Sequence, residues 1–121
     1  MAAPLLIIDA ANVVGSVPDG WWRDRAGATA RLRDRLSPAD LGVLTGGSTP
    51  EVVLVVEGRA RGVTSVPAVR VVAAPGSGDD EIVSLVGAAG DREVVVATAD
   101  RELISRVTAL GASVVGPKSV R

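Results

Sequence analysis

The sequence predicts an α/β domain in which helices cover both faces of a parallel sheet, and three observations lead to this fold class. Short runs rich in Val, Ile and Leu alternate along the chain with stretches of helical periodicity. These runs are apolar with little interruption, which is typical of strands buried on both faces. The composition, with 47% apolar residues but no Phe or Tyr, suits such a sheet packed under Ala-rich helices.

Five strands are expected, one from each apolar run. They span residues 4–8, 51–56, 68–73, 93–97 and 113–115. Strands that alternate with helices are expected to pair in parallel, in a doubly wound sheet. A length of 121 residues suits one hydrophobic core, so we expect a single domain over residues 1–121.

Helices are expected where apolar side chains recur at spacings of three or four residues, namely over residues 22–36, 79–89 and 100–110. Ser37 followed by Pro38 is a typical N-cap and first helical residue, so a short helix is expected there too. Gly111 is placed to end the last helix. The segment 58–67 is short for a crossover helix and is expected to be mostly loop.

The composition excludes several kinds of chemistry. Without Cys or His the chain has no disulfide, no thiolate nucleophile, no Ser-His-Asp triad and no ordinary zinc site. The net charge of −1 gives no global basic field, so any contact with RNA must come from a local patch. Twelve of the thirteen basic residues are Arg, which grips phosphate well, although a GC-rich genome explains the same bias. The chain start lacks the pattern of a signal peptide and no run reaches transmembrane length, so the expected location is cytoplasmic.

Acidic residues fall where predicted strands end and predicted helices begin. Asp9 ends the first strand, and Glu57 ends the second. Asp79 and Asp80 open the helix after the third strand, and Asp100 follows the fourth. The carboxyl ends of parallel strands lie at one edge of the sheet, where open α/β folds bind their ligands. We therefore expect these carboxylates to gather at that edge.

Carboxylates that gather repel one another unless some are protonated or a cation neutralises them. Oxygen ligands without His or Cys favour Mg²⁺ or Mn²⁺, which can activate water for hydrolysis of a phosphodiester. Each residue also has a simpler interpretation. Asp79 and Asp100 could be helix N-caps, Asp80 a first-turn charge and Glu57 a solvated strand end. Asp9 is harder to explain in this way, because it follows a buried run in which an unpaired carboxylate is costly.

Polar and basic neighbours extend the expected site. Asn12, in the loop leaving the first strand, could orient Asp9, contact a phosphate or form an Asx-turn. Thr98 could hold a water or simply close the fourth strand. Candidate phosphate contacts are Arg59, Arg61 and Arg101.

Two further features have structural interpretations that we favour. Trp21 and Trp22 could offer a stacking face to a base, but Trp22 in the core with Trp21 at the surface is the simpler arrangement. The segment Gly76-Ser77-Gly78 lacks the P-loop Lys and is expected to be a tight turn before a helix.

Four segments together resemble the NYN domains of the PIN-like nuclease superfamily, especially those of the YacP type. LLIIDAANVVG resembles the opening strand with its D-x-x-N motif, and VVLVVEG resembles the second strand with its terminal acid. GSGDDEIV resembles the acidic helix start after strand three, and VVVATADREL resembles the motif that ends strand four. Their order and spacing match over residues 5–115, nearly the whole chain.

The resemblance implies a three-layer PIN-like α/β/α fold with a five-stranded parallel sheet in the order 3-2-1-4-5. It also implies an Mg²⁺- or Mn²⁺-dependent ribonuclease that acts on RNA. The family's core acids correspond to Asp9, Asp79 and Asp100, and its motif Asn to Asn12. Glu57 stands where many members have Asp, and Asp80 could replace Asp79 in the metal site. Proteins of this superfamily often dimerise, although no feature of this sequence requires a homodimer.

Other functional classes fit less well. A receiver domain shares the strand plan, and Thr98 and Lys118 match it loosely, but Ala73, Ala74 and Pro75 occupy the place of its phosphorylated Asp. A haloacid-dehalogenase phosphatase needs D-x-D after the first strand, and Ala11 breaks that motif. The Asp-x-Ser/Thr start that is usual in the toxin of a toxin–antitoxin pair is absent from this sequence. A PIN-like domain that binds RNA or protein without cutting remains an alternative.

Overall fold

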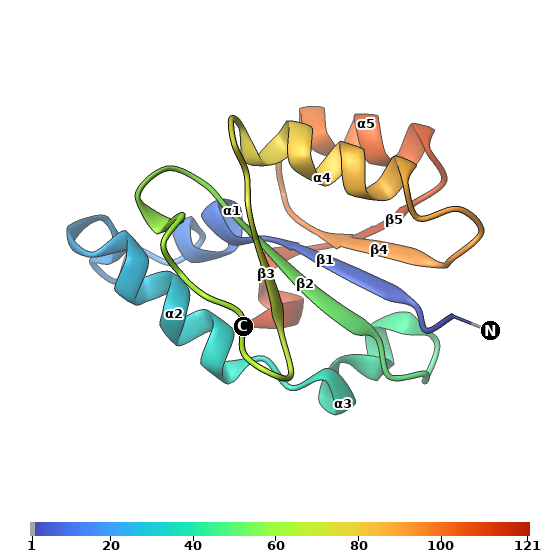
Figure 1. Cartoon of the computed structure of the whole chain (residues 1–121), viewed down its shortest axis with the longest axis horizontal. Helices are drawn as coiled ribbons and strands as arrows, with labels where there is room; N and C mark the ends of the chain where they lie inside the picture. The colour runs from blue at the N-terminus through green and yellow to red at the C-terminus, as the bar shows by residue number, and fades with distance from the viewer. Residues whose placement is uncertain (1) are drawn as a thin grey trace.

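The computed structural model describes residues 2–121 and contains one five-stranded, all-parallel sheet in the order β3-β2-β1-β4-β5 (Figure 1). The strands are β1 (Leu5–Asp9), β2 (Glu51–Val56), β3 (Arg70–Ala73), β4 (Val94–Ala97) and β5 (Ser113–Val115). The predicted fold class and the strand order implied by the family resemblance are both confirmed.

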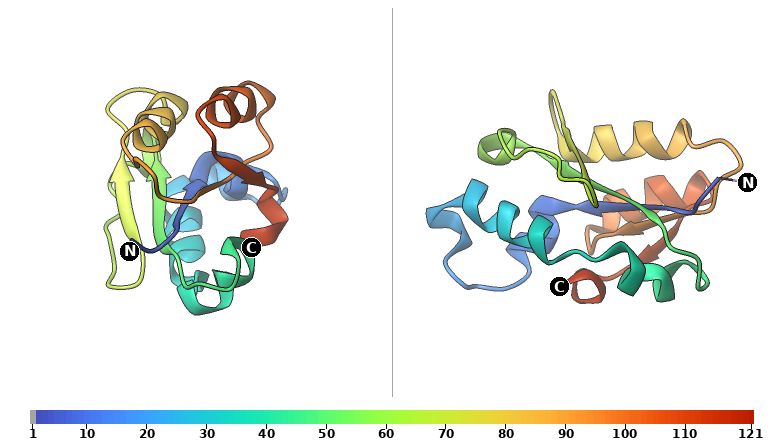
Figure 2. Two further views of the ribbon diagram at one scale, coloured as in Figure 1. Left: turned by 90° about the vertical axis from the view of Figure 1, so that its right-hand side faces the viewer. Right: turned by 60° about the horizontal axis from the view of Figure 1, so that its bottom comes forward.

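Helices form a layer on each face of the sheet (Figures 1 and 2). On one face lie α1 (Ala10–Gly15), α2 (Arg25–Arg35) and α3 (Pro38–Leu41), and on the other lie α4 (Gly78–Gly87) and α5 (Arg101–Ala109). Short 3-10 turns complete the chain: η1 (Trp21–Arg23), η2 (Gly42–Thr45), η3 (Gly58–Ala60) and η4 (Pro117–Val120). The three-layer α/β/α architecture follows from this arrangement. No helix within residues 2–121 is long and apolar enough to cross a membrane.

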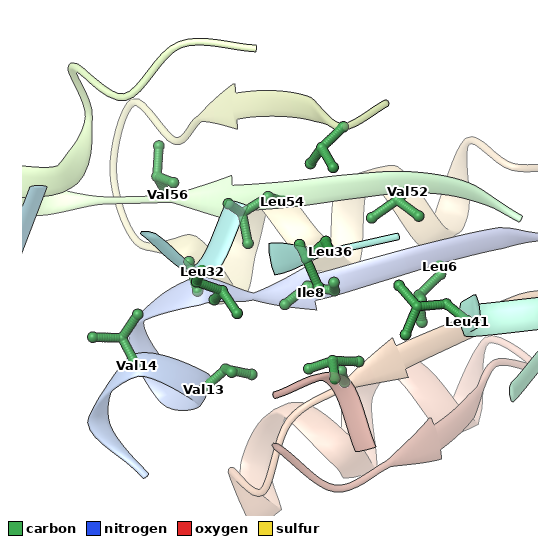
Figure 3. Packing of buried hydrophobic residues seen from close by; sticks show 14 of the residues in the cluster. Leu6, Ile8, Val13, Val14, Leu32, Leu36, Leu41, Val52, Leu54 and Val56 are labelled. Atoms are coloured by element: carbon green, nitrogen blue, oxygen red, sulfur yellow. The ribbon is translucent and has the colours of Figure 1, made fainter. Parts of the chain in front are cut away.

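The strands divide the core into two clusters, because successive side chains point to opposite faces of a sheet. Figure 3 shows the cluster under α1 and α2, where Leu6 and Ile8 of β1 meet Leu32 of α2 and Leu36, which directly follows that helix. The odd-numbered residues of β1 instead pack under α4 and α5, with Ile7 in the same cluster as Ile82, Leu103 and Val107. Burial on both faces explains why the strands are apolar at almost every position.

The N-terminal half departs from the predicted helices at two places. Asn12, expected in the loop that leaves the first strand, instead lies in the first turn of α1. Helix α2 begins at Arg25 rather than residue 22, because the Asp24 side chain caps it by accepting a hydrogen bond from the Gly27 N–H at 2.9 Å.

The expected placement of the two tryptophans is wrong. Trp22 is 51% exposed, whereas Trp21 is partly buried against the core. The physical reason is the separate 3-10 turn η1, which takes both residues out of the helical register that would have placed Trp22 in line with the apolar face of α2. Trp22 therefore carries the exposed ring of the pair, and Trp21 packs partly against the core.

Other boundaries shift by one or two residues. Strand β3 begins at Arg70 because Val66 and Val69 form an isolated antiparallel bridge just before it. Helix α4 begins at Gly78 with Ser77 as its N-cap, so Asp79 is not the cap. Gly111 ends α5 with a left-handed φ of 94°, as predicted. The segment 58–67 contains no helix apart from the turn η3 and is mostly loop, as expected.

Candidate functional site

Asp9 is the last residue of the central strand β1. The alternation of side chains along the strand determines the face of the sheet on which Asp9 lies. It continues the row of Leu5 and Ile7, so it lies on the face covered by α4 and α5. Glu57 continues the corresponding row after β2, and Thr98 the row after β4. Helices α4 and α5 also begin at this edge of the sheet (Figure 1). The acidic residues at the starts of these two helices therefore lie near the ends of the strands.

The Asp9 carboxylate is held by two hydrogen bonds in a nearly closed environment. The residue is only 5% exposed. Its Oδ2 accepts a hydrogen bond from the Thr98 hydroxyl at 2.9 Å, and its Oδ1 accepts one from the Asn12 N–H at 3.4 Å. No Arg or Lys forms an ion pair with Asp9 within residues 2–121. The carboxylate is therefore positioned firmly but is not neutralised.

The pKa of Asp9 reflects this environment. Burial raises it from 3.8 to about 6, because a charged carboxylate loses its water. The hydrogen bonds from Thr98 and Asn12 act in the opposite direction, and the negative charges of Asp79 and Glu57 raise the pKa further. Those charges act on Asp9 because the carboxylates gather at one edge, as the sequence predicted.

Thr98 and Asn12 tie the end of β4 to the end of β1. The Thr98 hydroxyl donates to Asp9 and accepts a hydrogen bond from the Asp100 N–H at 3.1 Å. The Asn12 side-chain oxygen accepts from the Ala99 N–H at 2.8 Å. The Asn12 side chain thus links α1 to the segment that carries Asp100, and it is the Asn12 backbone N–H, not the side chain, that contacts Asp9.

Asp100 caps α5, as one of its two interpretations predicted. Its Oδ1 accepts a hydrogen bond from the Leu103 N–H at 3.1 Å. Capping engages one carboxylate oxygen and leaves Oδ2 without a hydrogen bond within residues 2–121. The capping role is therefore compatible with a second role for the same side chain at the sheet edge.

The structure separates Asp79 from Asp80. Asp79 is half-buried, and its pKa is raised first by burial and then by the charges of Asp100 and Glu57. Asp80 is exposed and forms an ion pair with Arg106 of α5 at 3.0 Å. Asp79 consequently belongs to the group of facing acids, while Asp80 lies on the outer surface of α4. We call Asp9, Glu57, Asp79 and Asp100 the acidic cluster.

Glu57 joins the end of β2 to the start of α4. Its Oε2 accepts a hydrogen bond from the Gly78 N–H at 2.7 Å. A Cβ on Gly78 would lie only 3.3 Å from the carboxyl carbon of Glu57, so the close approach depends on glycine. Glu57 is half-buried rather than a freely solvated strand end.

The three predicted phosphate contacts are exposed arginines on different segments. Arg59 lies in η3, Arg61 follows it, and Arg101 is the first residue of α5. Within residues 2–121 none of them forms an ion pair with an acidic side chain. Their contact with phosphate stays a prediction.

The donor chemistry of the acidic cluster fits a hard divalent cation, but the side chains do not stand around a common point. All four donors are carboxylates, and the pKa of both Asp9 and Asp79 is raised first by burial and then by the charges of neighbouring acids. Among residues 2–121, however, no three acidic side chains are close enough as they stand to hold a metal ion. Binding a metal would require some of these side chains to turn inward.

Comparison with known proteins supports the fold. No family model matches the chain, and no curated protein matches it significantly. Two crystal structures of Rae1 (YacP) from Bacillus subtilis, one of them of a point mutant, are similar in fold. The mutant structure has a TM-score of 0.74 at 20% identity over 97% of this chain and 72% of its own. The other has a TM-score of 0.71 at 19% identity over 96% of this chain and 70% of its own. This chain has the fold of the YacP structures.

Sequence reasoning missed a cavity beside the acidic cluster and two residues that line it, Arg25 and Thr29. The cavity has a volume of about 430 Å³ and borders Glu57 and Trp21. The sequence carries no clear signal for this wall, because the non-helical residue Asp24 separates Trp21 from Arg25.

Proposed function

We propose that this protein is a divalent-metal-dependent ribonuclease whose metal site is the acidic cluster. The observation that carries the proposal is the buried Asp9 carboxylate at the end of the central strand, which faces other acids and has no compensating cation within residues 2–121. Such an arrangement is costly in a structure that gains only stability from it. The fold of the YacP structures and the family motifs around Asp9, Asp79 and Asp100 support the same conclusion.

Asp9, Asp79 and Asp100 are the proposed metal ligands, and Glu57 is an additional donor at the same edge. A bound Mg²⁺ or Mn²⁺ would supply charge neutralisation and lower the pKa of its water, as phosphodiester hydrolysis at neutral pH requires. Thr98 and Asn12 position Asp9 and the Asp100 segment, respectively. Arg59, Arg61 and Arg101 are proposed to contact phosphates of the RNA. All these residues come from one chain, so the proposal does not require a homodimer.

The test is cleavage of a mixed RNA pool by the wild type, Asp9→Asn and Asp100→Asn. Both substitutions remove a charge but keep a hydrogen-bond acceptor for Thr98 or for the cap of α5, so the fold is expected to survive. The wild type should cut in Mg²⁺ or Mn²⁺ but not in EDTA, and each variant should cut at least tenfold more slowly. Equal behaviour of all three proteins under all three conditions would exclude the nuclease.

A second candidate function is binding of RNA or protein by this fold without cleavage. The absence of three acids at ligand distance among residues 2–121 favours it. The same experiment separates the two functions, because a non-catalytic module retains a labelled RNA in a binding assay but leaves it intact in both metals.

A further inference from the structure

The cavity beside the acidic cluster lies at the carboxyl ends of β1 and β2, on the α1 and α2 side of the sheet. Its volume of about 430 Å³ falls within the range of small-molecule sites. Ala10 and Ala11 of α1 line one part, Trp21 and Arg25 line another, and Glu57 lies at its border. Because Glu57 also belongs to the acidic cluster, the cavity and the proposed metal site share a wall.

Small residues keep the cavity open. Ala11 is exposed on α1, and a Cβ on Gly76 would meet no atom within 4 Å. Gly58 adopts a left-handed φ of 57°, a conformation that other residues rarely occupy. The opening is therefore a property of the backbone and of these short side chains.

One wall of the cavity is aromatic and cationic. Trp21 packs partly against the core, and the guanidinium of Arg25 lies 5.3 Å from the centre of its ring. Trp22 packs against the same indole in an edge-to-face arrangement, with 5.8 Å between the ring centres. Indole rings and guanidinium planes are the groups on which proteins stack unpaired RNA bases. The wall is thus held in place before any ligand arrives.

Polar groups at the border suit the edge of a base better than a phosphate. Glu57 Oε2 accepts from Gly78, while Oε1 accepts no hydrogen bond within residues 2–121 and can receive one from a base N–H. The Thr29 hydroxyl donates to the carbonyl of Arg25 at 2.8 Å, which fixes the start of α2. The carboxylate of Glu57 would repel a phosphate, and Arg25 supplies a single positive charge to offset this repulsion.

We infer that this cavity receives a nucleobase of a single-stranded RNA, which stacks on the wall formed by Trp21 and Arg25 and donates a hydrogen bond to Glu57. The inference rests on the proposed function for the identity of the ligand. It adds a base-binding subsite directly next to the acidic cluster, so that a nucleotide held there presents its backbone to the proposed metal site.

The test measures base binding without cleavage, in EDTA. In the Trp22→Phe protein, Trp21 is the only indole, and its fluorescence reports on the cavity. The probes are the four nucleosides, which carry no phosphate for the acidic cluster to repel, and ribose, which has the same sugar but no base. Ala11→Leu in this background fills the cavity from an exposed helical position, where Leu is a good helix former. Ala39→Leu, at an exposed position on α3, is the matched control.

We expect saturable quenching by at least one nucleoside and none by ribose. Ala11→Leu should weaken that binding at least tenfold, and Ala39→Leu should leave it unchanged. The inference is overturned if no nucleoside saturates, if ribose binds as well as the nucleosides, or if Ala11→Leu binds as tightly as its control. Base binding without any RNA cleavage in Mg²⁺ or Mn²⁺ would exclude the proposed nuclease activity and support the base-binding cavity. Cleavage without base binding would support the nuclease activity and exclude the base-binding cavity.

Discussion

The Thr98 hydroxyl donates a 2.9 Å hydrogen bond to Oδ2 of Asp9 and so links the ends of β4 and β1 across 89 positions of sequence. Both residues are buried, at 1% and 5% exposure. Hydrogen bonds to buried charged groups contribute roughly 1.5–3 kcal/mol. This contact therefore has a measurable effect on stability as well as on the position of the carboxylate.

Replacement of Thr98 tests that contact. Thr98→Val removes the hydroxyl at nearly constant volume and should lower the free energy of unfolding by about 2 kcal/mol at pH 7. Thr98→Ser keeps the donor and should lose clearly less. Urea denaturation of both variants provides the measurement, and equal losses would show that the hydroxyl is not what matters at this position.

The pKa of Asp9 predicts how stability depends on pH in metal-free protein. Because burial raises this pKa to about 6, the folded state binds the proton more tightly than the unfolded state, whose Asp pKa is near 3.8. This tighter proton binding contributes roughly 3 kcal/mol to the free energy of unfolding. The contribution is complete below pH 3.8 and is lost as pH rises through about 6. Asp9→Asn should remove this term.

Urea denaturation in EDTA at pH 4 and pH 7.5 measures the effect. The stability of Asp9→Asn relative to the wild type should increase between these two values, because only the wild type has to bury a charge at pH 7.5. Taking the difference between the two proteins cancels the titration of groups that do not interact with Asp9. A difference that stays the same at both pH values would contradict the burial argument.

Asn12 is predicted to matter for activity more than for stability. Its side-chain oxygen accepts a 2.8 Å hydrogen bond from Ala99, which is exposed, so Asn12→Ala should cost only about 1 kcal/mol. The segment that carries Asp100 would nevertheless lose its brace, and a small displacement there should slow RNA cleavage roughly tenfold or more.

Ser16→Ala is the matched control for Asn12→Ala. It removes a 2.6 Å hydrogen bond to the Val13 carbonyl at the other end of α1, away from Asp100. Cleavage rates and urea denaturation should be measured for both variants. A similar loss of activity in the two proteins would show that α1 as a whole, and not the Asn12 contact, controls the rate.

Two glycines of α4 should respond in opposite ways to alanine. Gly87 has open space around it, so Gly87→Ala should stabilise the helix by up to about 1 kcal/mol. At Gly78 the new Cβ would lie 3.3 Å from the Glu57 carboxyl carbon and would disturb the 2.7 Å hydrogen bond. Gly78→Ala should therefore be less stable than Gly87→Ala by about 1 kcal/mol or more in thermal or urea denaturation.

A double-mutant cycle identifies the cause of that difference. In a Glu57→Ala background the crowding is absent, so Gly78→Ala should no longer be worse than Gly87→Ala. Persistence of the full difference in that background would mean that the backbone of α4, rather than the Glu57 contact, resists the change.

The sheet and the positions of the acids could be predicted from sequence because both depend on local patterns. An apolar run such as residues 51–56 identifies a strand buried on both faces, and an acid directly after it must lie at the carboxyl end. The alternation of side chains then places Asp9, Glu57 and Thr98 on one face. These features need no knowledge of long-range packing.

The remaining features depend on contacts between distant residues or on the exact start of a helix. The Asp24 side chain accepts a hydrogen bond from the Gly27 N–H, so α2 begins only at Arg25. As a result Trp22 is exposed, and Trp21 is the tryptophan that packs partly against the core. The distinction between Asp79 and Asp80 depends on Arg106 of another helix, which pairs with Asp80. The cap is local but competes with the apolar spacing that continues back to residue 22, whereas no local pattern predicts the pairing between the two helices.

The pair Asp79 and Asp80 also offers the most direct test of the central claim that the acidic cluster binds a catalytic metal. Calorimetric titration of Mn²⁺ should be compared in wild type, Asp79→Asn and Asp80→Asn, which remove the same charge from adjacent residues of one helix turn. The account predicts that the wild type binds Mn²⁺, that Asp79→Asn weakens binding at least tenfold, and that Asp80→Asn changes it little. Absence of binding in the wild type, or equal loss in the two variants, would contradict it.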